Sequence, residues 1–277
     1  MGNDSELILS REYLYSLVAN SIDQLDPYIR LKNSREFIRD VFRDSAKFVS
    51  YFEKDINNKQ DYSFDEFDRL IKQAMNEIEN DSFKEVLDSR ILKESYKRFE
   101  DRKKNYSYKA IIVSVFKDIA AYHNILIEKS FVNPFFKESD KEKIGNRPQT
   151  FLSYAYYDKG LSLGLFLYFQ RMGGFLYVNW MWNGTNDDSS ITKIELDKEL
   201  YKSSQFLLLR TLNSEFDYYA KKQIRQWCSW EIGNYYNKNP DEKYYVSFYD
   251  GDSASNDLLM TFKVFGRVYN GTIIEKR

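Results

Sequence analysis

The distribution of glycine constrains this chain most, because it divides the 277 residues into two unlike halves. Between Met1 and Ile144 the only glycine is Gly2, whereas the other ten of the 11 glycines lie from Gly145 onward. Glycine permits the tight turns that separate short elements. We therefore predict long helices in the first half and short alternating elements in the second, with the boundary within residues 141–148.

The apolar spacing of the first half is that of helices. Between Phe37 and Phe52, apolar side chains recur mostly at steps of three and four residues, which makes one stripe along a helix. Three pairs with Ser or Asn followed by Glu three residues later resemble capping boxes. We expect helices over 5–25, 34–57, 63–79, 82–104 and 108–130, and hence an all-α helical domain over residues 1–144.

The second half, residues 145–277, alternates strand and helix patterns. We expect strands over 150–155, 175–182, 205–212 and 244–249, and helices over 158–171, 193–203, 226–237 and 258–268. This alternation predicts an α/β fold with a parallel sheet and helices on both faces. Ligands of such sheets bind beyond the carboxyl ends of the strands, so the loops after Tyr154, Trp182 and Leu212 should converge on one site.

The composition narrows the chemistry further. The single cysteine, Cys228, excludes a disulfide framework and a thiolate zinc site, and the single histidine, His123, argues against a histidine-rich metal centre. The formal net charge is -1, which does not favour a broad nucleic-acid-binding surface. No signal peptide and no apolar run near the length of a membrane span are apparent in the sequence. We expect a cytoplasmic protein that binds no metal and no membrane.

A basic stretch over residues 97–109 leaves two interpretations open. Its lysines and arginines are interrupted by Glu100 and Asp101, which favours a solvated helix end over a nucleic-acid patch. Nucleic-acid binding through this stretch would show as a steep loss of affinity with rising salt.

The segment Trp227-Cys228-Ser229-Trp230-Glu231-Ile232-Gly233 is the most unusual feature of the chain. Trp227 and Glu231 are four residues apart and therefore share one face of a helix. We expect this face at the helix start, where the macrodipole stabilises a carboxylate. The segment then represents either a catalytic carboxylate in an aromatic pocket or an acidic residue beside two core tryptophans.

The second half resembles the bacterial TIR (Toll/interleukin-1 receptor) domain over about residues 149–270. TFLSYAYYDK is similar to the first strand and following loop of that family, and Gly174-Phe175 with Tyr177-Val178-Asn179-Trp180 is similar to its second strand. WCSWEIG resembles the W-x-x-W-E-L-G helix of one prokaryotic group, whose W-x-x-x-E spacing carries the catalytic glutamate of NAD-cleaving members. The resemblance implies a flavodoxin-like parallel sheet.

The resemblance also implies roles for individual residues. Glu231 corresponds to the catalytic residue and Trp227 to a wall of its pocket; Tyr154 and Tyr156 would flank the nucleotide. Asn183 and Gly184 would open the BB loop, the loop after the second strand, over the site. The chain departs from the family at Asn179, where Asp is common, and at Arg210-Thr211, where a small residue usually follows the third strand. Arg210 would then contact a phosphate of the nucleotide.

The implied reaction is cleavage of the nicotinamide–ribose bond of NAD, with NAD as substrate and no cofactor. The products would be nicotinamide and either ADP-ribose or a cyclic isomer, in Thoeris-like antiphage defence. Homo-oligomers formed through both halves are expected, with a phage-derived trigger or a downstream effector as a further partner. The alternative is a non-catalytic TIR adaptor that assembles with other TIR domains.

Overall fold

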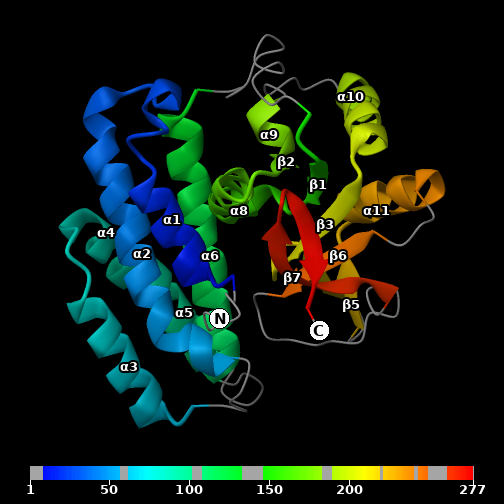
Figure 1. Ribbon diagram of the computed structural model, residues 1–277. Helices are drawn as coiled ribbons and strands as arrows, with labels where there is room; N and C mark the ends of the chain where they lie inside the picture. Colours follow the sequence, from blue (N-terminus) through cyan, green and yellow to red (C-terminus); the bar gives the residue numbers. More distant parts are fainter. Residues whose placement is uncertain are drawn as a thin grey trace, which may run out of the picture.

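The computed structural model describes residues 9–56, 62–101, 108–132, 146–182, 189–218, 221–239, 243–248 and 261–276. Figure 1 shows a layer of helices, coloured from blue to green, beside a twisted sheet whose strands run from green to red. The two-part organisation follows the uneven distribution of glycine along the chain.

The helical part is all-α, as the apolar spacing predicts. Its main helices are α1 (Arg11–Asn20), α2 (Arg35–Ile56), α3 (Phe64–Asn76), α4 (Asp81–Val86), α5 (Lys93–Asp101) and α6 (Tyr108–Ser130). Two short 3-10 turns, η1 (Asp26–Tyr28) and η2 (Lys32–Ser34), lie between α1 and α2. The helix expected over 82–104 is interrupted by a π-helical segment, η3 (Leu87–Leu92), between α4 and α5. The helix expected over 5–25 is shorter, because residues 21–25 form a turn.

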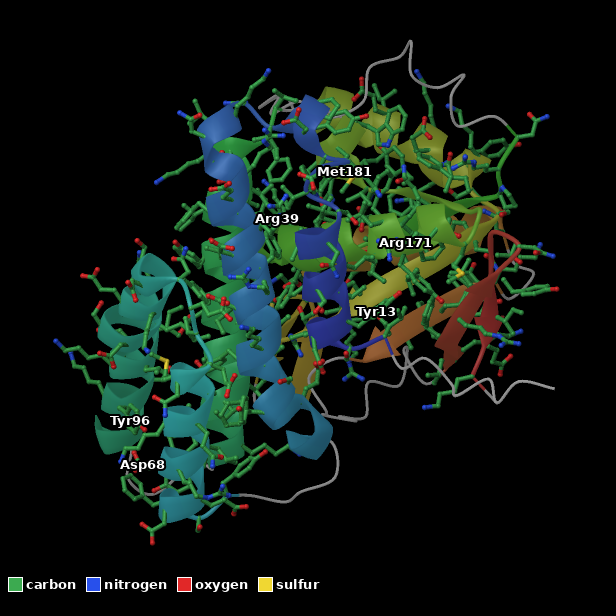
Figure 2. The ribbon with its side chains drawn as sticks, turned by 60° about the vertical axis from the view of Figure 1, so that its left-hand side comes forward. Tyr13, Arg39, Asp68, Tyr96, Arg171 and Met181 are labelled. Atoms are coloured by element: carbon green, nitrogen blue, oxygen red, sulfur yellow. The ribbon has the colours of Figure 1, made fainter. Side chains whose placement is uncertain are left out.

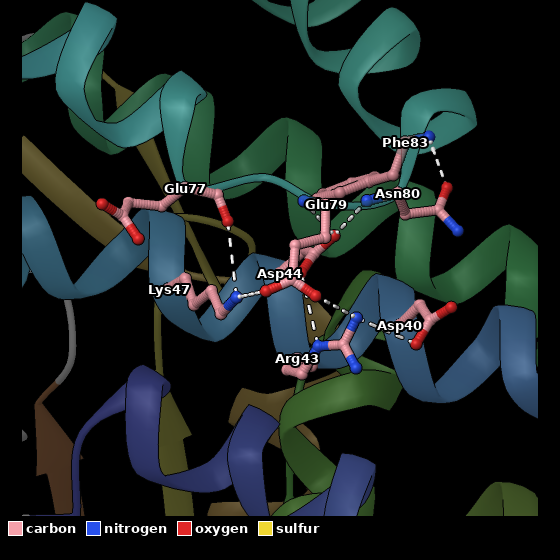
Figure 3. Close-up of polar contacts among 8 residues, drawn as sticks. All are labelled: Asp40, Arg43, Asp44, Lys47, Glu77, Glu79, Asn80 and Phe83. Carbon is pink, nitrogen blue, oxygen red and sulfur yellow. Dashed lines mark hydrogen bonds and ion pairs between the residues drawn. The ribbon is translucent and has the colours of Figure 1, made fainter.

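A polar network fastens the α3–α4 connection to α2, and Figure 3 shows its members. The buried carboxylate of Asp44 accepts the backbone N–H groups of Glu79 and Asn80, at 3.1 and 2.7 Å. Arg43 and Lys47 pair with the Glu79 side chain at 3.2 and 2.5 Å. Asn80 in turn caps α4 by accepting the N–H of Phe83. Asp44 therefore satisfies backbone donors that a short connection leaves unpaired.

The second part contains a six-stranded, mostly parallel sheet in the order β2-β1-β3-β6-β7-β8. Its strands are β1 (Gln149–Ser153), β2 (Phe175–Tyr177), β3 (Gln205–Arg210), β6 (Tyr244–Phe248), β7 (Lys263–Tyr269) and β8 (Thr272–Glu275). Within this sheet β8 pairs antiparallel with β7, and the other described pairs are parallel. A separate hairpin consists of β4 (Glu215–Tyr218) and β5 (Lys221–Ile224). The predicted α/β class and the predicted parallel pairing are confirmed.

Helices cover both faces of this sheet, as Figure 1 shows. The 3-10 turn η5 (Tyr156–Asp158) leads into α8 (Lys159–Arg171), which lies between the sheet and the helical part. On the other face lie α10 (Ser189–Lys202) and α11 (Gln226–Lys238). The short helix α9 (Asn179–Trp182) follows β2 directly.

Two expectations for the second half are wrong. The helix expected over 258–268 is strand β7 from Lys263 onward, with residues before 261 outside the described part. The strand expected over 175–182 ends at Tyr177, and residues 179–182 are helical. The hairpin β4–β5 and the antiparallel strand β8 were not expected.

The helical part packs directly on α8. Leu161 to Phe169 are all buried, and the buried apolar residues of both halves form one continuous core. Gly164 lies so close to α1 that an added Cβ would be 2.8 Å from the carbonyl oxygen of Leu14. Tyr13 meets Tyr168 edge-on, and Arg171 donates to Ser21 at 3.3 Å. Figure 2 labels Tyr13 and Arg171 at this boundary.

Helix α6 differs from the expectation that no apolar run approaches the length of a membrane span. Its 23 residues include a window with mean hydropathy 1.5, so it is long and apolar enough by composition to cross a membrane. Within the structure 61% of that window is buried against other helices and α8. Its His123 is fully buried, stacks on Phe42 with ring centroids 4.3 Å apart, and shares a 2.8 Å hydrogen bond with Ser45. These contacts are those of a core helix.

Candidate active site

The carboxyl group of Glu231 is the most unusual buried group of the sheet part. Glu231 lies in α11 and is only 4% exposed. Burial raises its pKa to about 8, although hydrogen bonds from Ser153 and Trp227 oppose the rise. A carboxyl group with such a pKa exchanges its proton near neutral pH, which is characteristic of catalytic acids and bases.

Two side chains donate to Glu231 from different elements. Ser153, the last residue of β1, places its hydroxyl 2.5 Å from Oε2 of Glu231. Trp227 lies one helical turn earlier in α11 and donates from its indole, as the four-residue spacing predicts. Its ring stacks on Trp230 at 5.4 Å and is 37% exposed. The carboxyl group therefore sits between a strand end and a partly open aromatic wall.

The helix macrodipole does not stabilise this carboxylate as expected. Helix α11 begins at Gln226, so Glu231 is its sixth residue and lies beyond the first turn. The favourable effect of a helix N-terminus fades within that turn. Burial therefore dominates, and the pKa of Glu231 rises instead of falling.

Cys228 borders the same carboxyl group. It is 1% exposed, and burial together with the nearby Glu231 raises its pKa to about 12. A thiol with this pKa stays protonated at neutral pH and is a poor nucleophile. Cys228 is therefore a small buried residue beside the carboxyl group.

Tyr154 follows Ser153 in the chain, and its side chain interacts electrostatically with Glu231. It is half-buried, and its hydroxyl oxygen accepts the backbone N–H of Trp180. Burial, with a contribution from the nearby Glu231, raises its pKa well above the ordinary value for tyrosine. The structure thus brings Tyr154, Trp227 and Glu231 together, as the sequence predicts.

Tyr156 is oriented differently from the expectation that it flanks a nucleotide. Its ring is 59% exposed, and its hydroxyl donates to the carboxylate of Glu128 on α6. That hydrogen bond, followed by burial, raises its pKa to about 12. In this structure Tyr156 contacts the helical part.

A second buried polar cluster lies around Asp158 at the carboxyl edge of the sheet, and the sequence alone does not predict it. Asp158 is 1% exposed, and its carboxylate accepts from Thr211 Oγ1 at 2.6 Å and from Asn213 Nδ2 at 2.8 Å. These bonds join the loop after β1 to the loop after β3. The expected convergence of these two loops is therefore observed. In the sequence, Asp158 is marked by its place in the motif TFLSYAYYDK, directly after the tyrosines.

Arg210 lies at the carboxyl end of β3 and is 5% exposed. Alternation along the strand places it on the same face as Phe206, whose ring contacts Tyr235 of α11. Arg210 therefore lies on the α11 face, the face that Ser153 and Glu231 share. Asn183 and Gly184 lie outside the described residues.

Cavity size alone would draw attention to the helical part. A cavity of about 1260 Å³ lies between α3 and the α4–α5 segment, and Figure 2 labels Asp68 and Tyr96 on its wall. Its lining combines charges of both signs. The buried carboxyl group of Glu231 is the stronger candidate site. A titratable group with a shifted pKa inside a polar cluster is typical of catalytic sites, whereas cavity volume alone is not.

Among the residues that the structure describes, no group of three or more His, Cys, Asp or Glu side chains is placed to hold a metal ion. We refer to Ser153, Tyr154, Trp227 and Glu231 as the Glu231 site. Comparisons of this chain with protein-family models, with curated proteins and with solved structures found no match.

Proposed function

We propose that the chain is a TIR-type NAD glycohydrolase or cyclase and that Glu231 is its catalytic residue. The observation that carries the proposal is a buried carboxyl group with a pKa near 8, held by Ser153 and Trp227 at the carboxyl end of β1. The parallel strands follow the order β2-β1-β3-β6-β7, which corresponds to the flavodoxin-like order 2-1-3-4-5. In that order ligands bind between the first and third strands, where the Glu231 site lies.

The chemistry of NAD fits a site with one carboxyl group. Nicotinamide leaves as a neutral molecule from a cationic ring, so the reaction needs no acid to protonate the leaving group. The transition state carries positive charge on the ribose, as in glycoside hydrolysis. An ionised Glu231 stabilises this charge and accepts hydrogen bonds from the ribose hydroxyls. The cationic ring of the substrate favours the ionised form and so offsets the raised pKa.

The neighbours of Glu231 support this role. Ser153 and Trp227 donate to the carboxylate and so fix its orientation. The partly exposed indole of Trp227 offers a surface on which a flat ring stacks. Arg210 is a cation on the same face, and we assign it to a phosphate of the nucleotide.

The fate of the ribosyl group depends on the attacking nucleophile. Water gives ADP-ribose, whereas attack by an adenine nitrogen or a ribose hydroxyl of the same molecule gives a cyclic isomer. Either product suits antiphage defence, by NAD depletion or by signalling. We further propose that the active form is a cytoplasmic homo-oligomer that responds to a phage-derived trigger or feeds a downstream effector.

The decisive experiment incubates full-length protein, at low and high concentration, with NAD and identifies the products by chromatography with mass detection. We expect free nicotinamide from the wild type and a loss of at least about a hundredfold in Glu231→Gln, which keeps the side-chain shape. The value of kcat/KM should rise with pH toward about 8, because the free enzyme must lose the Glu231 proton. Folded wild-type protein without turnover would leave two interpretations, the adaptor or an enzyme that waits for its trigger, and full activity in Glu231→Gln would reject the assignment.

A further inference from the structure

Three side chains form a contact between the helical part and the loop after β1, which we call the Glu128 latch: Glu128, Tyr156 and Lys159. The ammonium group of Lys159 lies 2.7 Å from Oε1 of Glu128, and the Tyr156 hydroxyl donates to the same oxygen. The Lys159 ammonium also lies 4.4 Å from the centre of the Tyr156 ring, within cation–π range. Glu128 belongs to α6, whereas the other two residues belong to η5 and α8.

The latch pairs a buried ammonium group with a partly exposed carboxylate. The side chain of Lys159 is 6% exposed, whereas that of Glu128 is 39% exposed. Partial burial favours a higher pKa for Glu128, but the bonds from Lys159 and Tyr156 outweigh it and hold the pKa below its ordinary value. A buried ammonium group that loses its carboxylate moves toward water, because desolvation of an uncompensated charge is costly.

The latch continues into the Glu231 site. The Lys159 ammonium lies 5.9 Å from the centre of the Trp180 ring, and the Trp180 indole donates to Ser162 of α8 at 3.0 Å. The backbone N–H of Trp180 donates to Tyr154, which borders Glu231. Ala155 alone separates Tyr154 from the latch residue Tyr156. A displacement of the loop that carries Tyr156 and Lys159 therefore moves Tyr154, whose side chain interacts electrostatically with Glu231.

We propose that Glu128 is a positioning residue through which the helical part restrains the β1–α8 loop beside the Glu231 site, and that releasing it speeds the reaction. The proposal rests on the proposed NAD cleavage. Its structural basis is that Glu231 is 4% exposed while Tyr156 is fastened to α6. Substrate must reach the buried carboxyl group, so the latched arrangement is a resting state.

The test compares full-length wild type with Glu128→Gln and with the control Glu36→Gln, an exposed residue in the first turn of α2. The amide keeps the shape of Glu128 but removes the charge that holds Lys159. We expect nicotinamide release to rise about fivefold, as for the loss of one charge-assisted contact. Amide hydrogen exchange over residues 154–160 should accelerate as well, and the control should change neither quantity.

Hydrogen exchange separates failure of the latch from failure of the proposed reaction. Unchanged exchange in Glu128→Gln overturns the latch whatever the enzyme does, and faster exchange with slower nicotinamide release overturns the proposed direction. Faster exchange without nicotinamide from any variant overturns the coupling to catalysis together with the proposed function.

Tyr156→Phe provides a second variant in case Glu128→Gln does not fold. It keeps the ring over Lys159 and removes only the hydroxyl that donates to Glu128. We expect a smaller acceleration of exchange over the same residues, and unchanged exchange in this variant counts against the latch.

Discussion

The helical part and the sheet part both bury polar side chains, but with different results. In the helical part the Asp44 carboxylate accepts two backbone N–H groups, so its burial fastens one connection to another helix. In the sheet part Glu231 receives donors from Ser153 and Trp227, and its pKa still rises to about 8. Buried polar groups that complete the backbone's hydrogen bonds stabilise a fold, whereas those left costly to ionise mark a site for chemistry.

The largest expected effect comes from separating the two parts. Residues 145–277 alone would expose the side of α8 that packs on α1 and α6, including buried leucines that contribute ~1.5–3 kcal/mol each. We expect this fragment to aggregate or to lack a cooperative thermal transition, while the full chain unfolds cooperatively. Calorimetry of both proteins is the measurement. A soluble, cooperatively folding fragment would show that the sheet part is independent of the helical part.

The second prediction separates stability from activity at Glu231. Its folded-state pKa is about 8 and therefore above the ordinary value of 4.5, so its contribution is fully present below pH 4.5 and declines as pH rises toward 8. The decline is about 1.4 kcal/mol per pH unit within this range. Glu231→Gln should therefore unfold at a higher temperature than wild type at pH 8, although it loses activity.

The control for this prediction is the same comparison at pH 4.5, where the wild-type carboxyl group is neutral in the folded state. The difference in unfolding free energy between variant and wild type should be much smaller there. An equal difference at both pH values would mean that Glu231 is not held neutral by burial.

The third prediction compares two glycines in helices. An added Cβ at Gly164 would lie 2.8 Å from both Cβ and the carbonyl oxygen of Leu14, whereas an added Cβ at Gly233 meets nothing within 4 Å. Gly164→Ala should cost about 1–3 kcal/mol, because α1 must move away from α8. Gly233→Ala should stabilise α11 by up to about 1 kcal/mol. Urea unfolding measures both, and equal signs would contradict the close approach of α1 and α8.

Much of the fold could be predicted because its signals are local. The stripe from Ile38 to Phe52 is buried as the helical spacing predicts, and QFLLLR forms a fully buried central strand. The α3–α4 network could not be predicted, because Asp44 and Asn80 are far apart in sequence and pair only after folding. The same reason applies to the bonds from Asp158 to the loop after β3.

The wrong helix at 258–268 has a physical cause. The β7–β8 pairing shifts register between Phe265 and Arg267, so Phe265 and Val268 are both buried although they are three residues apart. A bulge thereby gives a strand the spacing of a helix. The overlooked signal was Asn270-Gly271, a hairpin turn in which both residues have positive φ, 45° and 81°.

The Glu231 site could be predicted only in part, because one of its contacts is local in the sequence and another is not. Trp227 and Glu231 meet because a helix fixes their four-residue spacing, so the sequence alone predicts the contact. Ser153 pairs with Glu231 across 78 residues, and no local pattern indicates that bond. The orientation of Tyr156 depends on Glu128 of α6, which is 28 residues away and which the sequence of its own loop does not indicate.

The last prediction concerns His123, which is the counterpart of Glu231 in the helical part. Burial lowers its pKa to about 3, so its contribution to stability is present above pH 6.5 and declines as pH falls toward 3. The loss reaches about 2 kcal/mol at pH 5, at ~1.4 kcal/mol per pH unit. Between pH 4.5 and 6.5 the two groups change the free energy of unfolding in opposite directions. A fall in pH increases the contribution of Glu231 to stability and decreases that of His123. His123→Gln should therefore lose stability at pH 7 yet lose less than wild type on going to pH 5 in thermal unfolding. A parallel loss in both proteins would mean that His123 becomes protonated inside the folded helices, and the contrast between the two parts would not hold.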